Sequence, residues 1–188
     1  MTASTPDHEL VSLLARLCYR SGEFTLASGK KSDFYIDVKQ AVFSAEGFAI
    51  VARNLLDELA SEGITLVGGM ALGAIPLVSA ALSEAARRDY ALDGFFVRKT
   101  AKDHGTARRL DGRFDPDATI ALVEDVVTTG ESTLDAVDAV EAAGGRVSLI
   151  IAVVDREEND GLRRLAERCG KTVALASKSS VVAAAALP

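Results

Sequence analysis

One stretch of the sequence, residues 120–132, constrains the fold more than any other. It begins with four apolar residues, 120–123, which are typical of a buried strand in a parallel sheet. Leu134, Val137 and Val140 follow at helical spacing and predict an amphipathic helix. A buried strand that leads directly into a helix is the repeating unit of α/β proteins, so the sequence predicts that class.

The turn between this strand and helix has the chemistry of a phosphate and sugar site. It contains two adjacent carboxylates, Glu124 and Asp125, and then Thr128, Thr129 and Gly130. Backbone N–H groups at a helix start bind anions, and a glycine lets the ligand approach closely. The hydroxyls can donate to a phosphate, while the carboxylates can accept from two ribose hydroxyls. Each feature alone is ordinary at a strand end or helix cap, but together they predict a site for ribose 5-phosphate.

The whole stretch resembles the PRPP-binding motif of the type I phosphoribosyltransferases, where PRPP is 5-phosphoribosyl 1-pyrophosphate. In that motif two acidic residues follow an apolar strand and precede a Thr-Thr-Gly-x-Ser loop. The motif does not identify the base that accepts the phosphoribosyl group. The PRPP-binding residues that the resemblance implies here are Glu124, Asp125, Val126, Val127, Thr128, Thr129, Gly130, Glu131 and Ser132.

Length and composition indicate a soluble globular protein. The chain has 188 residues, 48% of them hydrophobic and 26% charged, which fits one domain with a full core. The net charge of -6 argues against nonspecific nucleic-acid binding as the main role. Cys18 and Cys169 lack the spacing of a zinc site or a disulfide framework, so we expect reduced thiols.

Neither export nor membrane insertion is expected. Residues 1–6 have no basic segment followed by an apolar one, and the sequence contains no run of about 18 apolar residues. We therefore expect a cytoplasmic protein without a membrane partner.

The N-terminal part of the chain predicts a helix and a hairpin. Leucines at helical spacing predict an amphipathic helix over residues 7–20. Strand-like residues 23–26 and 33–37 flank a predicted turn at residues 28–32. A lysine-bearing turn is also a common way to keep an edge hairpin soluble.

This segment resembles the N-terminal segment of orotate phosphoribosyltransferases, which separates them from related enzymes. The resemblance implies a hood over the base, with Phe34 and Tyr35 near the orotate ring, since aromatic faces suit a flat pyrimidine. Several relatives carry a lysine where this chain has Ala27, so a charge contact is lost there; Lys30 or Lys31 are candidates to compensate. The residues that carry the resemblance are Gly22-Glu23-Phe24-Thr25-Leu26, Ser28-Gly29, Lys31-Ser32 and Tyr35.

The parallel-sheet core is predicted to start after a helix over residues 46–62. A strand at residues 66–68 runs into a glycine-rich turn that opens a helix over residues 76–87. Alone, this is an ordinary strand-to-helix turn. In phosphoribosyltransferases the equivalent turn approaches the pyrophosphate through its backbone. Some orotate enzymes have Tyr-Lys where this chain has Leu72-Gly73, which leaves only backbone donors here.

A basic segment follows the next predicted strand, residues 94–97. Residues 98–109 have no apolar periodicity and predict a mobile surface loop. Between residues 96 and 113 six Lys or Arg face two Asp, which gives +4 within a chain of -6. A solvated basic loop is the usual explanation of such a run.

The order Arg-Lys-x-x-Lys-x-His-Gly in this loop resembles the catalytic loop of orotate phosphoribosyltransferases. That resemblance implies PRPP contacts from Arg98, Lys99, Lys102 and His104, with Lys102 as a catalytic residue. It also implies a homodimer, because in the family this loop, here residues 98–109, covers the neighbouring active site.

Arg156 is the best single indication of base identity. A buried strand is predicted at residues 147–154, and Arg156 follows it at the edge where ligands of α/β sheets gather. A guanidinium there can pair with the carboxylate of orotate, although a surface salt-bridge cluster would look similar. The family places an orotate-binding arginine in this Asp-Arg pair, and the resemblance adds Thr128 to the orotate site. A helix (159–169), a short strand (172–176) and a weakly determined apolar tail (181–187) complete the chain.

Together these features predict a doubly wound, mostly parallel α/β sheet of the type I phosphoribosyltransferase kind. We expect one domain, residues 1–188, with a hood mainly at 1–45 and a core at about 46–176. The resemblance implies an orotate phosphoribosyltransferase that makes orotidine 5'-monophosphate and pyrophosphate in pyrimidine synthesis. It requires Mg²⁺, bound mainly through PRPP without a protein cage. Asp125 is expected to stabilise positive charge on the sugar, with Lys102 drawing off pyrophosphate.

Three alternatives remain. A phosphoribosyltransferase for another base would share the PRPP turn but needs neither Arg156 nor the hood. A regulator that binds PRPP without turnover is disfavoured by the lysine loop and by the absence of a DNA-binding segment. A structural subunit would not need the basic loop.

Overall fold

The fold is a six-stranded sheet in the part of the chain that the structure, a computed structural model, describes: residues 7–25, 31–100 and 109–187. The strand order is β5-β4-β3-β6-β7-β8, and all neighbours are parallel except the antiparallel pair β4 and β5. The strands are β3 (Leu66–Gly68), β4 (Asp93–Val97), β5 (Leu110–Gly112), β6 (Ile120–Val127), β7 (Val147–Asp155) and β8 (Lys171–Ser177). The predicted mostly parallel sheet is confirmed.

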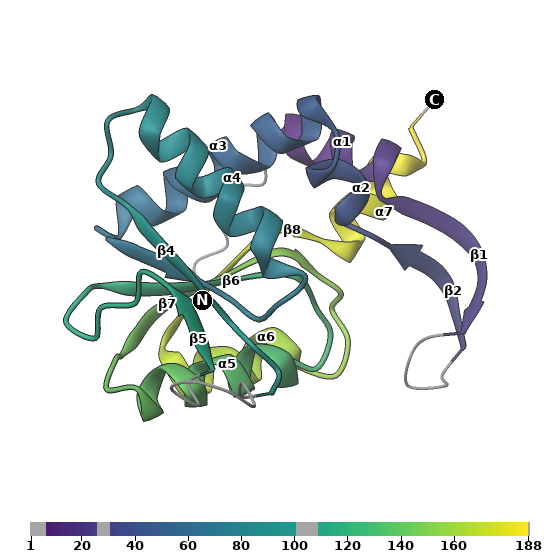
Figure 1. The fold of residues 1–188 in the computed structure, drawn as a ribbon. Helices are drawn as coiled ribbons and strands as arrows, with labels where there is room; N and C mark the ends of the chain where they lie inside the picture. Colours follow the sequence, from purple (N-terminus) through teal and green to yellow (C-terminus); the bar gives the residue numbers. More distant parts are fainter. Residues whose placement is uncertain (1–6, 26–30, 101–108, 188) are drawn as a thin grey trace.

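Helices cover both faces of this sheet. Helices α3 (Ala45–Ser61) and α4 (Ala74–Arg87) lie on one side, and α5 (Glu131–Ala142) and α6 (Gly161–Cys169) on the other (Figure 1). The doubly wound arrangement is therefore also confirmed. No helix among the described residues is long and apolar enough to cross a membrane.

Strand alternation divides the core into two layers. In β6, Ala121 and Val123 face the α3 and α4 side, whereas Ile120 and Leu122 face α5. All four side chains are at most 1% exposed. Because successive side chains of a strand point to opposite faces, an apolar run is what a strand covered on both sides requires.

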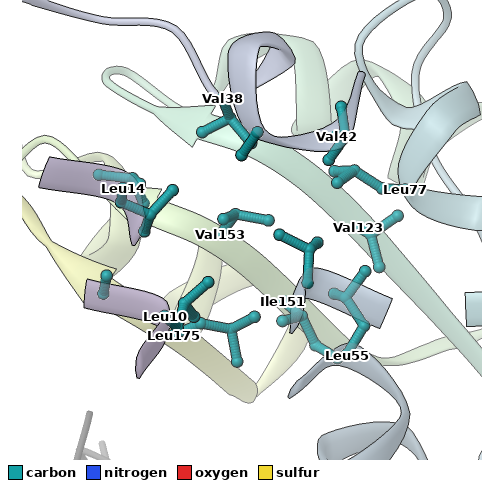
Figure 2. Close-up of a cluster of buried hydrophobic side chains, with 14 of the residues drawn as sticks. Leu10, Leu14, Val38, Val42, Leu55, Leu77, Val123, Ile151, Val153 and Leu175 are labelled. Carbon is teal, nitrogen blue, oxygen red and sulfur yellow. The ribbon is translucent and has the colours of Figure 1, made fainter. Parts of the chain in front are cut away.

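The N-terminal helix α1 (His8–Leu17) packs into the hydrophobic core. It packs against α7 (Lys178–Ala185) and α3, and its Leu10 and Leu14 are fully buried in the same cluster as Val153 and Leu175 of the sheet (Figure 2). Burying such leucines contributes about 1.5–3 kcal/mol each. The hairpin of β1 (Tyr19–Thr25) and β2 (Lys31–Ile36) forms a separate two-stranded antiparallel sheet, and Phe34 and Ile36 of β2 join the same buried cluster.

Three elements were not predicted from sequence. The apolar tail is helix α7, which a capping box stabilises: the Ser177 side chain accepts from the Ser180 N–H, and the Ser180 hydroxyl accepts from the Ser177 N–H. The two others are the short strand β5 and the single-turn helix α2 (Lys39–Val42), which lack length for a periodic signal. Both cysteines are free thiols, as expected, and burial raises the pKa of Cys18 to about 11.

Candidate active site

The acidic residues of the site lie within strand β6 rather than in the turn after it. Pairing of β6 with β7 continues to Val127 opposite Asp155, so the strand is longer than the four apolar residues that predicted it. Side chains alternate along a strand, so Glu124 and Asp125 leave β6 on opposite faces. The two carboxylates therefore have different surroundings.

Glu124 is buried against the start of helix α5. It is 7% exposed, and its Oε2 accepts hydrogen bonds from Ser132 Oγ at 2.8 Å and Thr133 Oγ1 at 2.9 Å. Burial, together with the nearby charge of Asp125, raises the pKa of Glu124 to about 7. Its carboxyl group therefore exchanges a proton near neutral pH, and the Ser132 hydroxyl is already engaged by it.

Asp125 faces the opposite side, toward the glycine-rich turn after β3. A Cβ on Gly73 would lie 3.2 Å from the Asp125 carboxyl atoms, so the missing side chain leaves the backbone close to this carboxylate. Asp125 Oδ1 accepts from the Val126 N–H at 2.8 Å. The Lys39 ammonium lies 2.7 Å from Asp37 and 4.0 Å from Asp125 Oδ2, and its hydrogen bond to Asp37 raises the pKa of Lys39.

The turn between β6 and α5 lines a small pocket. Gly130 has φ +76, which favours glycine, and the 12-residue helix α5 starts directly after it. The helix start carries partial positive charge from its N–H groups, which suits an anion. The pocket encloses about 150 Å³ and is lined by Glu124, Val126, Val127, Thr128, Thr129, Gly130, Ser132 and Thr133.

Helix α6 supports this turn from behind. Arg164 donates from Nη1 to the Thr129 carbonyl at 2.8 Å. A Cβ on Gly161 would lie 2.4 Å from the Thr128 carbonyl oxygen, so the first residue of α6 must be small. Leu165 is fully buried and would lie 3.0 Å from a Cβ on Gly130. The backbone of the turn is thus fixed by packing as well as by its own hydrogen bonds.

Arg156 follows β7 at the same edge of the sheet. Its backbone N–H donates to the Val127 carbonyl at 2.9 Å, which ties it to the β6 turn. The residue is 7% exposed, and its guanidinium lies 4.6 Å from the centre of the Phe34 ring. Its Nη2 makes only long contacts, 3.4 Å to Ser32 and 3.3 Å to Glu158, and among the described residues its Nε has no partner. Arg156 therefore retains donor capacity.

The predicted aromatic pair divides between two environments. Phe34 is 3% exposed and lies against Arg156, whereas Tyr35 is 40% exposed and contacts Phe24 of the same hairpin with ring centres 5.6 Å apart. Adjacent strand residues point to opposite faces, which explains the division. The structure thus brings Phe34, but not Tyr35, to Arg156.

The predicted basic loop is described only at its two ends. Arg98 pairs with Asp111, and its guanidinium lies over Phe96 at 5.9 Å from the ring centre, while Lys99 is exposed. The backbone N–H of Arg98 donates to the Arg109 carbonyl at 2.8 Å, which joins the two ends. Lys102 and His104 lie outside the described residues, as do Ala27 and Lys30.

Three residues at this edge were not predicted. Thr133 bonds Glu124, Lys39 approaches Asp125, and the Lys178 ammonium lies 4.4 Å from the centre of the Phe34 ring. Lys178 follows a parallel strand, so the reasoning that selected Arg156 could have found it. Lys39 had no such signal, because its approach to Asp125 depends on the unpredicted helix α2.

The carboxylates at this edge of the sheet suit a hard cation that is also bound by the phosphate oxygens of a ligand. In the described ranges no group of three or more His, Cys, Asp or Glu is placed to hold a metal ion. Glu124 is engaged by Ser132 and Thr133, which leaves Asp125 as the more accessible carboxylate. A single carboxylate beside a phosphate pocket is compatible with Mg²⁺, which keeps waters and binds phosphate oxygens.

The chain is similar to known proteins in both sequence and fold. No family model matches the chain. An orotate phosphoribosyltransferase from Thermosynechococcus vestitus is 45% identical over 152 residues, which covers 79% of this chain and 79% of that protein.

Two solved structures share the fold over nearly the whole chain. The orotate phosphoribosyltransferase of Mycobacterium tuberculosis H37Rv in complex with Fe(III) dicitrate has a TM-score of 0.79 at 31% identity and covers 92% of this chain and 97% of that one. The same enzyme in complex with 5-phospho-alpha-D-ribosyl 1-diphosphate has a TM-score of 0.75 at 27% identity, covering 93% and 97%.

Proposed function

The chain belongs to the orotate phosphoribosyltransferase family, and we propose that the edge formed by β6, β7 and the hairpin is its active site. The enzyme transfers the 5-phosphoribosyl group of PRPP to orotate and releases pyrophosphate and orotidine 5'-monophosphate, a step of pyrimidine biosynthesis. The bond from the ribose anomeric carbon to the pyrophosphate oxygen breaks, and a bond to an orotate ring nitrogen forms as that nitrogen loses its proton. Positive charge develops on the sugar and negative charge on the leaving group, so the site must stabilise both.

The observation that carries the site proposal is the pocket of about 150 Å³ where the β6 turn meets the start of α5. We assign the 5-phosphate of PRPP to it, bound by the backbone and hydroxyls of Thr128, Thr129 and Gly130. The N–H groups at the helix start favour an anion there, and the support from Arg164 holds the turn in position without the ligand. Val126, Val127, Glu131 and Ser132 complete the assigned PRPP segment.

The ribose is assigned to the carboxylates of β6. Asp125 is half-buried and reaches toward the glycine-rich turn, where its negative charge would stabilise the cationic sugar. Glu124 would accept from a ribose hydroxyl at Oε1, which has one long hydrogen bond, from the Asp125 N–H at 3.3 Å, while Ser132 and Thr133 occupy Oε2. The raised pKa of Glu124 lets this group bind either as acceptor or as donor near neutral pH.

Orotate is assigned to Arg156, Phe34 and Thr128, with Tyr35 at the more exposed side of the hairpin. The buried guanidinium has an unpartnered Nε among the described residues and lies beside an aromatic ring. A planar carboxylated pyrimidine offers an acceptor for the Arg156 guanidinium and a flat face that can pack against the Phe34 ring.

The basic loop is assigned to the pyrophosphate. Arg98, Lys99, Lys102 and His104 would neutralise the leaving group, and we propose that they act across a homodimer. Mg²⁺ bound mainly through PRPP would add charge stabilisation on the phosphate oxygens. We further propose that residues 1–188 work as one domain in the cytoplasm.

The direct test is to mix the protein with orotate, PRPP and Mg²⁺ and to follow the loss of orotate absorbance. Replacing Lys102→Ala should lower kcat by about 100-fold or more, because the loss of a charge that acts only in the transition state lowers turnover. Lys171→Ala is the matched control, since Lys171 pairs with Glu62 at the opposite end of β8. Near-normal turnover of the Lys102 variant would contradict the assignment.

The dimer proposal has its own test. Mixed dimers of a Lys102→Ala subunit and an Asp125→Asn subunit should recover part of the activity, because one of the two sites then has both residues intact. Purified mixed dimers without recovery would mean that each site is complete within one chain.

A further inference from the structure

A second cation, Lys178, meets the Phe34 ring beside Arg156. Strands β7 and β8 are parallel and in register at Asp155 and Ser177, so the next residues, Arg156 and Lys178, leave the sheet side by side at the same edge. The Arg156 guanidinium carbon lies 4.6 Å from the Phe34 ring centre and the Lys178 ammonium 4.4 Å from it. Two cations therefore converge on one aromatic side chain next to the proposed orotate site.

Acidic side chains neutralise this pair of cations incompletely. Arg156 is more than nine-tenths buried, has an unpartnered Nε among the described residues, and has one carboxylate contact, Glu158 at 3.3 Å. Over the same described ranges no carboxylate oxygen lies within 4.0 Å of the Lys178 ammonium. A buried guanidinium with unused donors is unfavourable, and an anion would satisfy it.

Local helix energetics do not explain the position of Lys178. It is the first residue of α7, where the helix dipole disfavours a positive charge. The neighbouring carboxylate of Glu157 is directed instead to Ser179, accepting from its N–H at 2.8 Å and its hydroxyl at 2.9 Å. A cation that is unfavourable for its own helix and lacks a close acidic partner is well placed to meet a ligand.

We propose that Lys178 is a specificity-determining residue that, together with Arg156, binds the carboxylate of the base. The inference rests on the proposed function, since it places an orotate-derived carboxylate beside Phe34. Arg156 supplies the planar bidentate donor from the buried side. Lys178, which is half-buried, supplies a point charge from the side of α7. The pair would favour a base with a carboxylate over the same base without one.

The test compares two nucleotides that differ only in this group, orotidine 5'-monophosphate and uridine 5'-monophosphate. Calorimetric binding is measured for the unaltered protein, for Lys178→Met and Lys178→Arg, and for Lys171→Met as the matched control. We expect Lys178→Met to weaken the binding of orotidine 5'-monophosphate about tenfold or more, which is the usual effect of losing a charged contact. Uridine 5'-monophosphate should bind within about twofold of the unaltered protein, and Lys178→Arg should keep most of the discrimination.

The proposal is overturned if Lys178→Met leaves the ratio of the two affinities unchanged, whether the variant binds both nucleotides as before or binds both more weakly by the same factor. Thermal unfolding separates a binding defect from a folding defect, because removing a cation from a helix start should not lower stability. Turnover of orotate by the unaltered protein is measured separately. Its absence would refute the proposed function, whereas normal turnover with an unchanged affinity ratio in the Lys178 variant would refute only the role of Lys178.

Discussion

The buried carboxyl group of Glu124 should make the stability of this protein depend on pH around neutrality. Burial and the charge of Asp125 raise its pKa from 4.5 to about 7. A carboxyl group with a raised pKa in the folded state stabilises folding while it is protonated. That contribution is fully present below the unfolded pKa, is lost progressively as pH rises, and is gone above the folded pKa.

Replacing Glu124→Gln should remove this dependence. Glutamine imitates the protonated acid, and its carbonyl oxygen can still accept from Ser132 and Thr133. With these two pKa values, the stability that protonated Glu124 contributes falls by about 1 kcal/mol by about pH 5.5 and by about 3 kcal/mol by about pH 8.5. The free energy of unfolding of the variant relative to the unaltered protein should therefore rise by about 2 kcal/mol across that interval.

Urea unfolding at several pH values between these limits measures the difference directly. For a chain of this size about 2 kcal/mol corresponds to about 4–8 °C in Tm, so a thermal scan is an independent check. Glu58→Gln in α3 is a suitable control, because Glu58 is less buried than Glu124. If the variant and the unaltered protein kept a constant difference in stability at every pH, the assignment of a raised pKa to Glu124 would be wrong.

Three further predictions concern packing, capping and the phosphate turn. Gly68→Ala should destabilise the protein by about 1–3 kcal/mol in urea unfolding, because the new Cβ would lie 2.3 Å from the buried Phe95 ring; an unchanged midpoint would show that Phe95 moves without cost. Ser177→Ala should cost about 1 kcal/mol through loss of the α7 cap. Ser61→Ala, which removes a hydroxyl that donates to the Glu58 carbonyl, should cost less. Arg164→Ala should raise KM for PRPP about threefold to tenfold by releasing the Thr129 carbonyl, with KM for orotate unchanged. Arg163→Ala is its control, since Arg163 pairs with Asp160 and Glu167 on the surface, and equal effects of the two variants would count against a role for Arg164.

Local patterns in the sequence were sufficient for the sheet and for much of the site. The apolar run at residues 120–123 and the helical spacing after Ser132 predicted β6 and α5. The polar residues between them predicted a turn, because they come where the strand ends. Arg156 could be selected because it follows a buried strand, and parallel strands end at a common edge. These predictions succeed because each depends on residues close together in the chain.

The length of β6 and the helical structure of the C-terminal tail could not be predicted from local sequence patterns. Glu124 and Asp125 were assigned to a turn because their side chains are charged, yet backbone pairing with β7 continues past them to Val127. The alanine-rich tail is a helix because Ser177 and Ser180 cap it and because it packs against α1, from the other end of the sequence. Tertiary pairing here overrides weak local signals.

The sequence by itself determined that this chain builds an α/β sheet with an acidic, hydroxyl-rich turn at its edge, because strand and helix periodicity are local properties. Only the tertiary structure decided that Glu124 and Asp125 face opposite sides, that Lys39 approaches Asp125, and that Lys178 joins Arg156 at Phe34. Those neighbours come from segments far apart in the chain, and strand register and helix packing bring them together.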